Sequence, residues 1–352
     1  MTRLPLLPPL PQGPFRFAAL DVETANNTRG SICQIGVAFV REDGGIETWV
    51  THVDPQTEDW SCTWVHGITA ETVAEICAQE LGIPVSHVTV QAPDTDNSPY
   101  CLGSLASRVT INAGNAMLGA ARQARSQILE AAAQKLGCEA ADLTIADGVV
   151  HSGKNPNLFA PLPEICRYHI FRHGGEGILV RHTHDPKTVM MNKEHYGNIA
   201  PAYSFAAQAL EVEVDTETGQ VRVVETYLSD DCGKAINPLT VHGQSAGAAV
   251  QAIGWTLYEE LQMEGGRVMN GNLADYTMPT AEAVPTMHSD IVETDEPNGP
   301  LGAKGASETA ILPGAPAIAN AVYDAIGVRI TDLPITPEKI LAALAAKEQP
   351  HA

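Results

Sequence analysis

The chain has 352 residues, enough for two domains with a real core, and its 44% hydrophobic and 18% charged content is typical of a soluble globular protein. Only 5% of the residues are aromatic, so the core is built from alanine, valine, isoleucine and leucine. The formal net charge of −21 argues against a broad nucleic-acid surface, because a phosphate track needs positive potential.

The seven cysteines include no C-x-x-C pair, and their irregular spacing indicates neither a disulfide framework nor a zinc or iron–sulfur site. We therefore expect a reducing, cytoplasmic compartment. Residues 1–13 are rich in proline and lack an uninterrupted apolar stretch, so they predict a disordered tail rather than a signal peptide. No run of about 18 apolar residues occurs, so no membrane-spanning helix is expected.

The segment after the tail has the pattern of strands. Apolar stretches at 17–20 and 31–40 and an alternating stretch at 46–53 predict three strands. Asp21 and Glu23 stand two residues apart where the first strand ends, so their carboxylates point to the same side. Such a pair can hold a divalent metal, Mg or Mn, for phosphoryl chemistry; the alternative is a meander without a metal.

Residues 14–72 resemble the opening of the DEDDh exonucleases, on the stretch FAALDVETANNTRGSICQIGVAFV and the later His66-Gly67-Ile68-Thr69. The resemblance implies that Asp21 and Glu23 bind the catalytic metals of a 3′–5′ exonuclease. The family also needs a second aspartate and a late His-x(4)-Asp motif, and this chain supplies neither in a recognisable setting. A truncated metal-dependent exonuclease and a residual three-stranded meander are therefore the two interpretations.

The following residues predict helices and a hairpin. A short helix over 74–82 ends at Gly82, a strand lies at 88–90, and a long helix spans 115–136. Apolar residues at helical spacing mark the buried stripe of the long helix: Met117, Ala121, Ala124, Ile128, Ala132 and Leu136. Residues 143–150 form a predicted hairpin.

Residues 151–200 are irregular and rich in histidine, which predicts an exposed loop or interface arm, with a metal site as the alternative. Alternation of apolar and polar residues over 210–215 and 221–224 predicts an antiparallel hairpin. The remaining predicted elements are a helix over 242–260, a strand over 289–293, a helix over 315–326 and a last helix from Pro337 to about 345.

Two glycine-rich loops carry candidate functional groups. Residues 299–309, GPLGAKGASET, let the backbone approach a ligand closely, with Lys304 as a cation for an anionic ligand and Glu308 as a general base. An ordinary surface loop with a solvated glutamate is the alternative. In the second loop, Gly103 to Arg108, hydroxyls and an arginine can bind phosphate, unless the segment only leads into the long helix.

Taken in chain order, six motifs resemble the C-terminal part of the large subunit of the molybdenum hydroxylases, the family of xanthine dehydrogenase, aldehyde oxidase, carbon monoxide dehydrogenase and 4-hydroxybenzoyl-CoA reductase. The motifs are AEICAQELGIP, DTDNSPYCLGSLASRVTINAGNA, LEVEVDTETGQVRVVE, DDCGKAINPLTVHGQ, NGPLGAKGASE and ITDLPITPEKIL. The resemblance covers about 270 residues. It implies an α+β domain of mixed sheets and helices that binds molybdenum–molybdopterin, with the cytosine dinucleotide form as one candidate.

The resemblance implies a role for each matching residue. Glu308 corresponds to the family's catalytic glutamate, which acts as a base, and Gln244 to a glutamine that hydrogen-bonds the pterin. The other matching positions belong to cofactor-side loops: Gly103, Ser104, Ser107, Arg108, Asp231, Asn237, Lys304, Gly305 and Ser307. The resemblance also implies a small-molecule substrate, iron–sulfur and FAD subunits or domains on other chains, and an oligomer.

Two features depart from the family pattern. Ser307 stands where the family usually has glycine, and the first half of the molybdenum subunit has no counterpart here. We expect two truncated pieces joined near residues 70–75, which would act as a molybdopterin-dependent oxidoreductase fragment, as a truncated exonuclease, or as an inactive fusion remnant. The expected segments are a tail 1–13, an exonuclease-like segment 14–72, a molybdopterin-binding domain 73–346 and a tail 347–352.

Overall fold

The computed structural model describes residues 15–23, 33–41, 46–53, 70–91 and 103–348, the first three ranges by their backbone. These three ranges are strands β1 (Phe15–Glu23), β2 (Cys33–Arg41) and β3 (Ile46–Val53). They pair in the order β1-β2-β3 as an antiparallel sheet, which confirms the three predicted strands. Asp21 and Glu23 lie opposite Gly36 and Gln34, and their side chains lie outside the described part of the chain.

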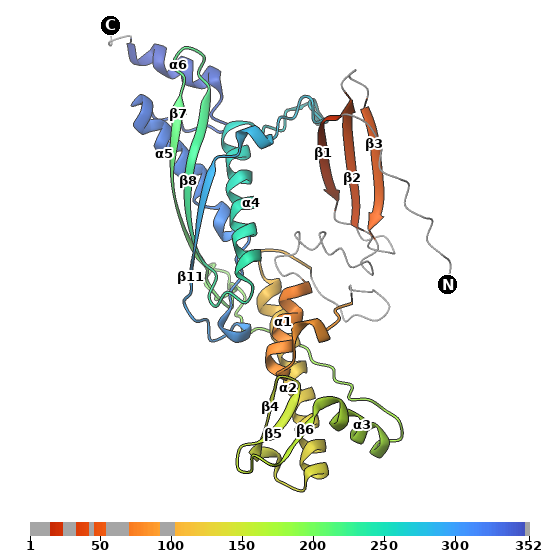
Figure 1. The fold of residues 1–352 in the computed structure, drawn as a ribbon. Coiled ribbons are helices and arrows are strands. Elements are labelled where there is room, and N and C mark those ends of the chain that lie inside the picture. Colours follow the sequence, from red (N-terminus) through yellow and green to blue (C-terminus); the bar gives the residue numbers. More distant parts are fainter. Residues whose placement is uncertain (1–14, 24–32, 42–45, 54–69, 92–102, 349–352) are drawn as a thin grey trace.

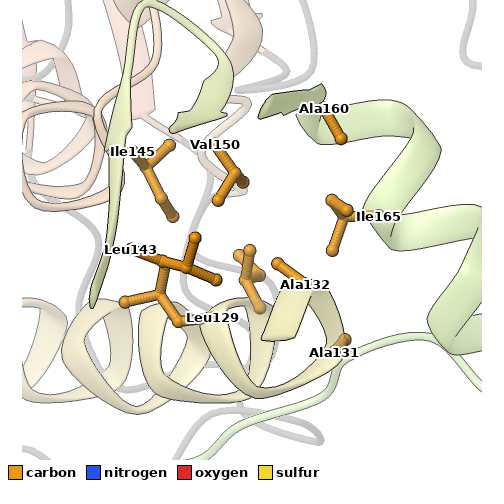
Figure 2. Close-up of a cluster of buried hydrophobic side chains, with 9 residues drawn as sticks. Leu129, Ala131, Ala132, Leu143, Ile145, Val150, Ala160 and Ile165 are labelled. Carbon is orange, nitrogen blue, oxygen red and sulfur yellow. The ribbon is translucent and has the colours of Figure 1, made fainter. Parts of the chain in front are cut away.

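A lobe of helices and short strands follows, at the bottom of Figure 1. Its elements are α1 (Ala70–Leu81), α2 (Val109–Leu136), β4 (Leu143–Ala146), β5 (Val149–Ser152), β6 (Phe159–Pro161) and α3 (Leu162–Arg172). The strands form an antiparallel sheet in the order β4-β5-β6. Figure 2 shows the core of this lobe, where Leu129 of α2, Ile145 of β4, Val150 of β5 and Ile165 of α3 are buried together.

The second lobe is a three-stranded sheet covered by helices (Figure 1). Its elements are β7 (Phe205–Val214), β8 (Val221–Asp231), α4 (Pro238–Leu257), β9 (Met263–Glu264), β10 (Arg267–Val268), β11 (Thr286–Val292), α5 (Gly314–Ile326) and α6 (Pro337–Glu348). Strand β8 is central, antiparallel to β7 and parallel to β11. Ile253 of α4, Ile318 of α5 and Ile340 of α6 are buried with Val223 of β8, so the predicted α+β class is confirmed.

Local sequence explains where two of the helices begin or end. Gly82 follows α1 with φ +62°, and a Cβ there would overlap the carbonyl oxygen of Ile145. Only glycine satisfies both this backbone angle and the close approach of β4. Asn237 precedes α4, and its side-chain oxygen accepts a hydrogen bond from the Thr240 amide at 3.2 Å, with Pro238 at the first helical position.

The structure differs from the predicted elements in three places. Residues 88–90, which follow a 3-10 turn over Val85–His87, form no strand, because they pair with none of the described strands. Helix α3 lies inside the segment predicted to be irregular; Ile165 is its one buried residue, so its sequence carries almost no helical stripe. Helix α2 begins at Val109, before the predicted start at residue 115, because Thr110 and Ile111 are buried in its first turn.

Asp230 is a carboxyl buried in the layer between β8 and α4. The residue is 0% exposed, and Ser245 of α4 donates a hydrogen bond to its Oδ2 at 3.4 Å. Its Oδ1 has no hydrogen-bond partner within the described part of the chain. Burial, reinforced by the neighbouring charge of Asp231 and opposed by Ser245, raises the pKa of Asp230 to about 7.

We predict that Asp230 makes this protein less stable as the pH rises. Because the folded state binds the proton of Asp230 more tightly than the unfolded chain, the contribution of Asp230 is full below about pH 4 and is lost as pH rises through about 7. Asp230→Asn is therefore expected to stabilise the protein at pH 8 relative to pH 5, by up to about 1.4 kcal/mol for each unit of pKa shift. Urea unfolding at both pH values measures this, with the exposed Asp290→Asn as control; an equal effect of Asp230→Asn at both pH values would contradict it.

Candidate functional site

The site is built around the glycine-rich loop 299–308, which connects β11 to the helices at the end of the chain. This loop pairs with the segment that follows β8. The Lys304 amide donates to the carbonyl oxygen of Cys232 at 2.7 Å, and the Lys234 amide donates to the carbonyl oxygen of Gly302 at 2.8 Å. Gly233 and Ala303 form an isolated antiparallel bridge between these bonds. Two stretches predicted separately as cofactor-side loops are therefore one two-stranded unit.

A buried ion pair fixes this unit to the sheet. The ammonium group of Lys304 donates to Asp231 Oδ2 and to Thr294 Oγ1, each at 2.7 Å, and the Lys304 and Asp231 side chains are 6% and 9% exposed. Burial opposes the charge of Asp231, but hydrogen bonds from Lys304, Thr294 and the Gly233 amide outweigh it and hold the pKa of that carboxyl below its usual range. Two residues predicted to lie on the cofactor side are therefore partners of each other, and Lys304 also lines the cavity described below, so their role toward a cofactor stays a prediction.

Glu308 lies exposed at the end of the same loop, in contact with the start of α2. Ser107 Oγ accepts a hydrogen bond from the Glu308 amide at 2.8 Å and donates to Glu308 Oε2 at 3.2 Å. The hydroxyl of Ser307 lies 2.9 Å from the hydroxyl of Ser107. The structure therefore brings together three predicted site residues, although Ser107 contacts the predicted base rather than standing apart in a phosphate loop.

Gly305 makes the approach of these two loops possible. It is buried, and a Cβ at this position would overlap the backbone carbonyl oxygen of Ser107. Its own carbonyl oxygen accepts a hydrogen bond from Ser204 Oγ at 2.6 Å, on the segment that leads into β7. A glycine is required here for packing, so Gly305 holds the loop that carries Glu308 against the loop before α2.

The loop before α2 leaves one cationic group without a partner. With the Asn112 amide oxygen turned toward the guanidinium, Arg108 Nε donates to it at 2.8 Å. Arg108 Nη1 is buried and has no hydrogen-bond partner among the described residues. Gly103 and Ser104 are exposed in the same loop, and no atom lies within 4 Å of a Cβ built at Gly103, whose φ is +86°. An unpaired guanidinium nitrogen beside an open glycine suits an anionic ligand.

A cleft open to solvent lies between α1, α2 and the N-terminus of α4. Its lining includes Thr72, Thr110, Asn237, Thr240 and Gln244, together with Ala303, Lys304 and Ala306 of the glycine-rich loop. Hydroxyl and amide side chains that converge on a cleft can fix the orientation of a bound small molecule or cofactor. The predicted pterin-binding Gln244 is part of this lining.

Asn237 contributes to the cavity mainly by fixing a helix. Besides capping α4, its amide nitrogen donates to Glu75 Oε1 of α1 at 3.1 Å. Burial raises the pKa of Glu75, an effect that the Asn237 hydrogen bond opposes and the nearby Glu71 reinforces. No sequence pattern predicts that Glu75, Thr294 or Ser204 belongs to the site, because each forms a hydrogen bond with a residue that is distant in the chain.

The two predicted metal sites have different outcomes. The side chains of Asp21 and Glu23 lie outside the described residues, so the exonuclease site stays a prediction. In the part of the chain that the structure describes, no three histidine, cysteine, aspartate or glutamate side chains converge as metal ligands. In the histidine-rich segment, His169 of α3 stacks on His173 with ring centroids 3.9 Å apart, and most of residues 173–199 are exposed.

We predict that Lys304→Met destabilises the protein by about 3–5 kcal/mol, because it leaves the Asp231 carboxylate buried without its cation. Urea unfolding at pH 7 measures the loss. Lys234→Met is the matched control, since Lys234 is 58% exposed and 3.6 Å from Glu293, and it should cost less than about 1 kcal/mol. Equal losses of unfolding free energy in the two variants would show that the buried Lys304–Asp231 pair stabilises the protein no more than the exposed Lys234–Glu293 pair does.

Comparison with known proteins identifies the family of the chain. A protein-family model described as the molybdopterin cofactor-binding domain matches residues 66–285. The gamma subunit of the 6-hydroxypseudooxynicotine dehydrogenase complex of Paenarthrobacter nicotinovorans is 34% identical over 289 residues, 77% of this chain and 34% of that protein. The carbon monoxide dehydrogenase large chain of Hydrogenophaga pseudoflava is 31% identical over 78% of this chain and 33% of its own length.

Solved structures agree with this result. Quinoline 2-oxidoreductase from Pseudomonas putida 86 matches with a TM-score of 0.68 and 28% identity, over 95% of this chain and 42% of that chain. Carbon monoxide dehydrogenase from Oligotropha carboxidovorans has the same fold, with a TM-score of 0.67 and 23% identity over 94% and 40%. These relatives give no support to the exonuclease resemblance of residues 14–72.

None of the described helices combines the length and the apolar character that crossing a bilayer requires. The chain spans about a third of the length of the curated relatives it matches. The match of the family model to well over half of the chain and the 34% identity over 77% of it lead to one conclusion: this chain belongs to the molybdopterin cofactor-binding domain family.

Proposed function

We propose that the chain is the cofactor-binding part of a molybdopterin-dependent oxidoreductase, with Glu308 as its catalytic base. The observation that carries the proposal is the position of Glu308. The loop that lines the polar cavity through Ala303 and Ala306 ends, two residues later, on this exposed carboxylate. A base must stand within reach of a bound reactant without being buried itself, and this loop provides that position.

The residues around the cavity fit a pterin with a phosphate or dinucleotide arm. Gln244 offers an amide to the pterin, and the buried, unpartnered Nη1 of Arg108 offers a cation to a phosphate. Gly103 and Ser104 of the same loop are exposed, which is also compatible with the cytosine dinucleotide form. When bound, the molybdenum–molybdopterin group supplies two-electron oxidation and reduction chemistry.

The substrate class and the partners follow from the family. We propose hydroxylation or reduction of an aromatic heterocycle, an aldehyde or an aryl-CoA; quinoline 2-oxidoreductase and the nicotine 6-hydroxylase large subunit are named for heterocyclic substrates. Two of the relatives are named as the gamma subunit of a complex and as a large chain, so we propose that the iron–sulfur and FAD centres lie on other chains of an oligomer. We also propose that the chain divides near residues 70–75 into an N-terminal segment and the molybdopterin-binding domain.

The composition of the purified protein tests this assignment directly. We expect molybdenum and pterin in amounts that match the protein when it is produced together with its partner subunits. Magnesium-dependent release of nucleotides from DNA, abolished by Asp21→Ala, would instead favour the exonuclease interpretation. Absence of both the cofactor and the nuclease activity would leave an inactive fusion remnant.

We predict that Glu308→Gln lowers turnover by about 10²–10⁴-fold while molybdenum and pterin stay bound, because the amide keeps the shape of the side chain but cannot accept the proton. Turnover is measured with a panel of aromatic heterocycles and aldehydes and an artificial electron acceptor. Glu282→Gln, an exposed glutamate outside the loop and the cavity lining, is the control and should keep full activity. Undiminished turnover of Glu308→Gln would exclude Glu308 as the base.

A further inference from the structure

Ser107 has an unusual backbone conformation and an unusual set of contacts. Its φ is +53°, in the left-handed region that residues other than glycine rarely adopt, and Ala106 before it has φ +49°. Strain of this kind persists where surrounding contacts determine the conformation, and it is concentrated at functional sites. The contacts of Ser107 reach Ser307 and Glu308, 200 and 201 residues further along the chain.

The proton positions around Ser107 follow from the number of donors. The Glu308 amide is a donor, so Ser107 Oγ accepts in that 2.8 Å bond. The single hydroxyl proton of Ser107 is then available for the carboxylate oxygen Oε2 of Glu308, at 3.2 Å. The hydroxyl of Ser307 lies 2.9 Å from Ser107 Oγ and is the donor of that bond when the Ser107 proton is on Glu308 Oε2. The result is a chain of hydrogen bonds that runs from Ser307 through Ser107 to the Glu308 carboxylate.

This arrangement fixes the base at two points. One bond holds the backbone of Glu308 and the other holds its Oε2, so the side chain is restrained in one orientation. Because Oε2 is occupied by the Ser107 hydroxyl, Oε1 is left to accept a proton. The close packing of Gly305 on the Ser107 carbonyl keeps the two loops at the distance that these bonds require.

We propose that Ser107 is a positioning residue that orients Glu308 for its role as base, and that Ser307 is accommodated because its hydroxyl bonds to Ser107. The inference rests on the proposed function of Glu308. It also replaces the assignment of Ser107 to the phosphate loop, which the sequence resemblance implies. In this structure Arg108, the next residue, keeps the free donor that a phosphate would need.

The test compares Ser107→Ala and Ser107→Gly with Ser86→Ala, an exposed serine outside the loops of the site. The glycine variant also removes the hydroxyl, but glycine adopts the left-handed backbone without strain, so it guards against a loss of folding. Two measurements need no turnover: the rate at which a water-soluble carbodiimide and an amine label the Glu308 carboxyl, and hydrogen exchange of the Glu308 amide. Both rates should rise about tenfold in the two Ser107 variants, the effect of one lost hydrogen bond to a charged group, and stay unchanged in Ser86→Ala.

In the loaded enzyme with its partner subunits, kcat should fall about tenfold in both Ser107 variants, with KM and molybdenum content unchanged. In a Glu308→Gln background, Ser107→Ala should cause no further loss, because there is no base left to orient. Such non-additivity distinguishes positioning from a general structural effect.

Three results would overturn the proposal: unchanged labelling and exchange at Glu308, an unchanged kcat, or a loss of molybdenum content in Ser107→Ala that indicates a phosphate ligand instead. A wild-type protein without turnover would count against the proposed function alone. The labelling and exchange rates would still decide whether Ser107 holds Glu308.

Discussion

The ion pair between Lys304 and Asp231 is the contact on which the site depends. Asp231 ends the central strand β8, and Lys304 lies in the middle of the glycine-rich loop, so the pair joins the sheet to the loop that carries Glu308. Both side chains are almost inaccessible to water, where an unpaired charge is costly and a paired one tolerates little displacement. Thr294, just beyond β11, bonds to both partners and fixes the arrangement from the neighbouring strand.

From this anchor the rest of the site follows in steps. The bridge between Gly233 and Ala303 continues the pairing of β8 into the loop, Gly305 then packs on the loop before α2, and Ser107 receives Glu308. The cavity beside these contacts is closed on its other side by α1 and by the N-terminus of α4, which Asn237 ties to Glu75. The carboxylate of Glu308, the cavity and an arginine nitrogen without a hydrogen-bond partner among the described residues thus lie in segments that these contacts connect.

Much of the fold could be predicted because its signals are local. Periodicity indicated the hairpin of β7 and β8 and the helices α1, α2 and α5, and Gly82 and Gly327 stand where α1 and α5 end. The elements that the sequence patterns missed have weak local signals: α3 buries a single isoleucine, and the first turn of α2 is defined by its contacts with other elements. The position of Glu308 at the end of a glycine-rich loop was also predictable, since the residue type and its neighbours carry that information.

The sequence by itself determined the α+β class, the family, and the residue types available to the site. It did not determine which of those residues face a ligand. Lys304 and Asp231 look like ligand-binding groups in a linear motif, but they neutralise each other across 73 residues. Ser107 looks like part of a phosphate loop, but its hydroxyl bonds to Glu308. Only the tertiary structure decides such pairings, because a buried charge or hydroxyl is satisfied by whichever group the fold brings within hydrogen-bonding distance, and chain separation gives no measure of that distance.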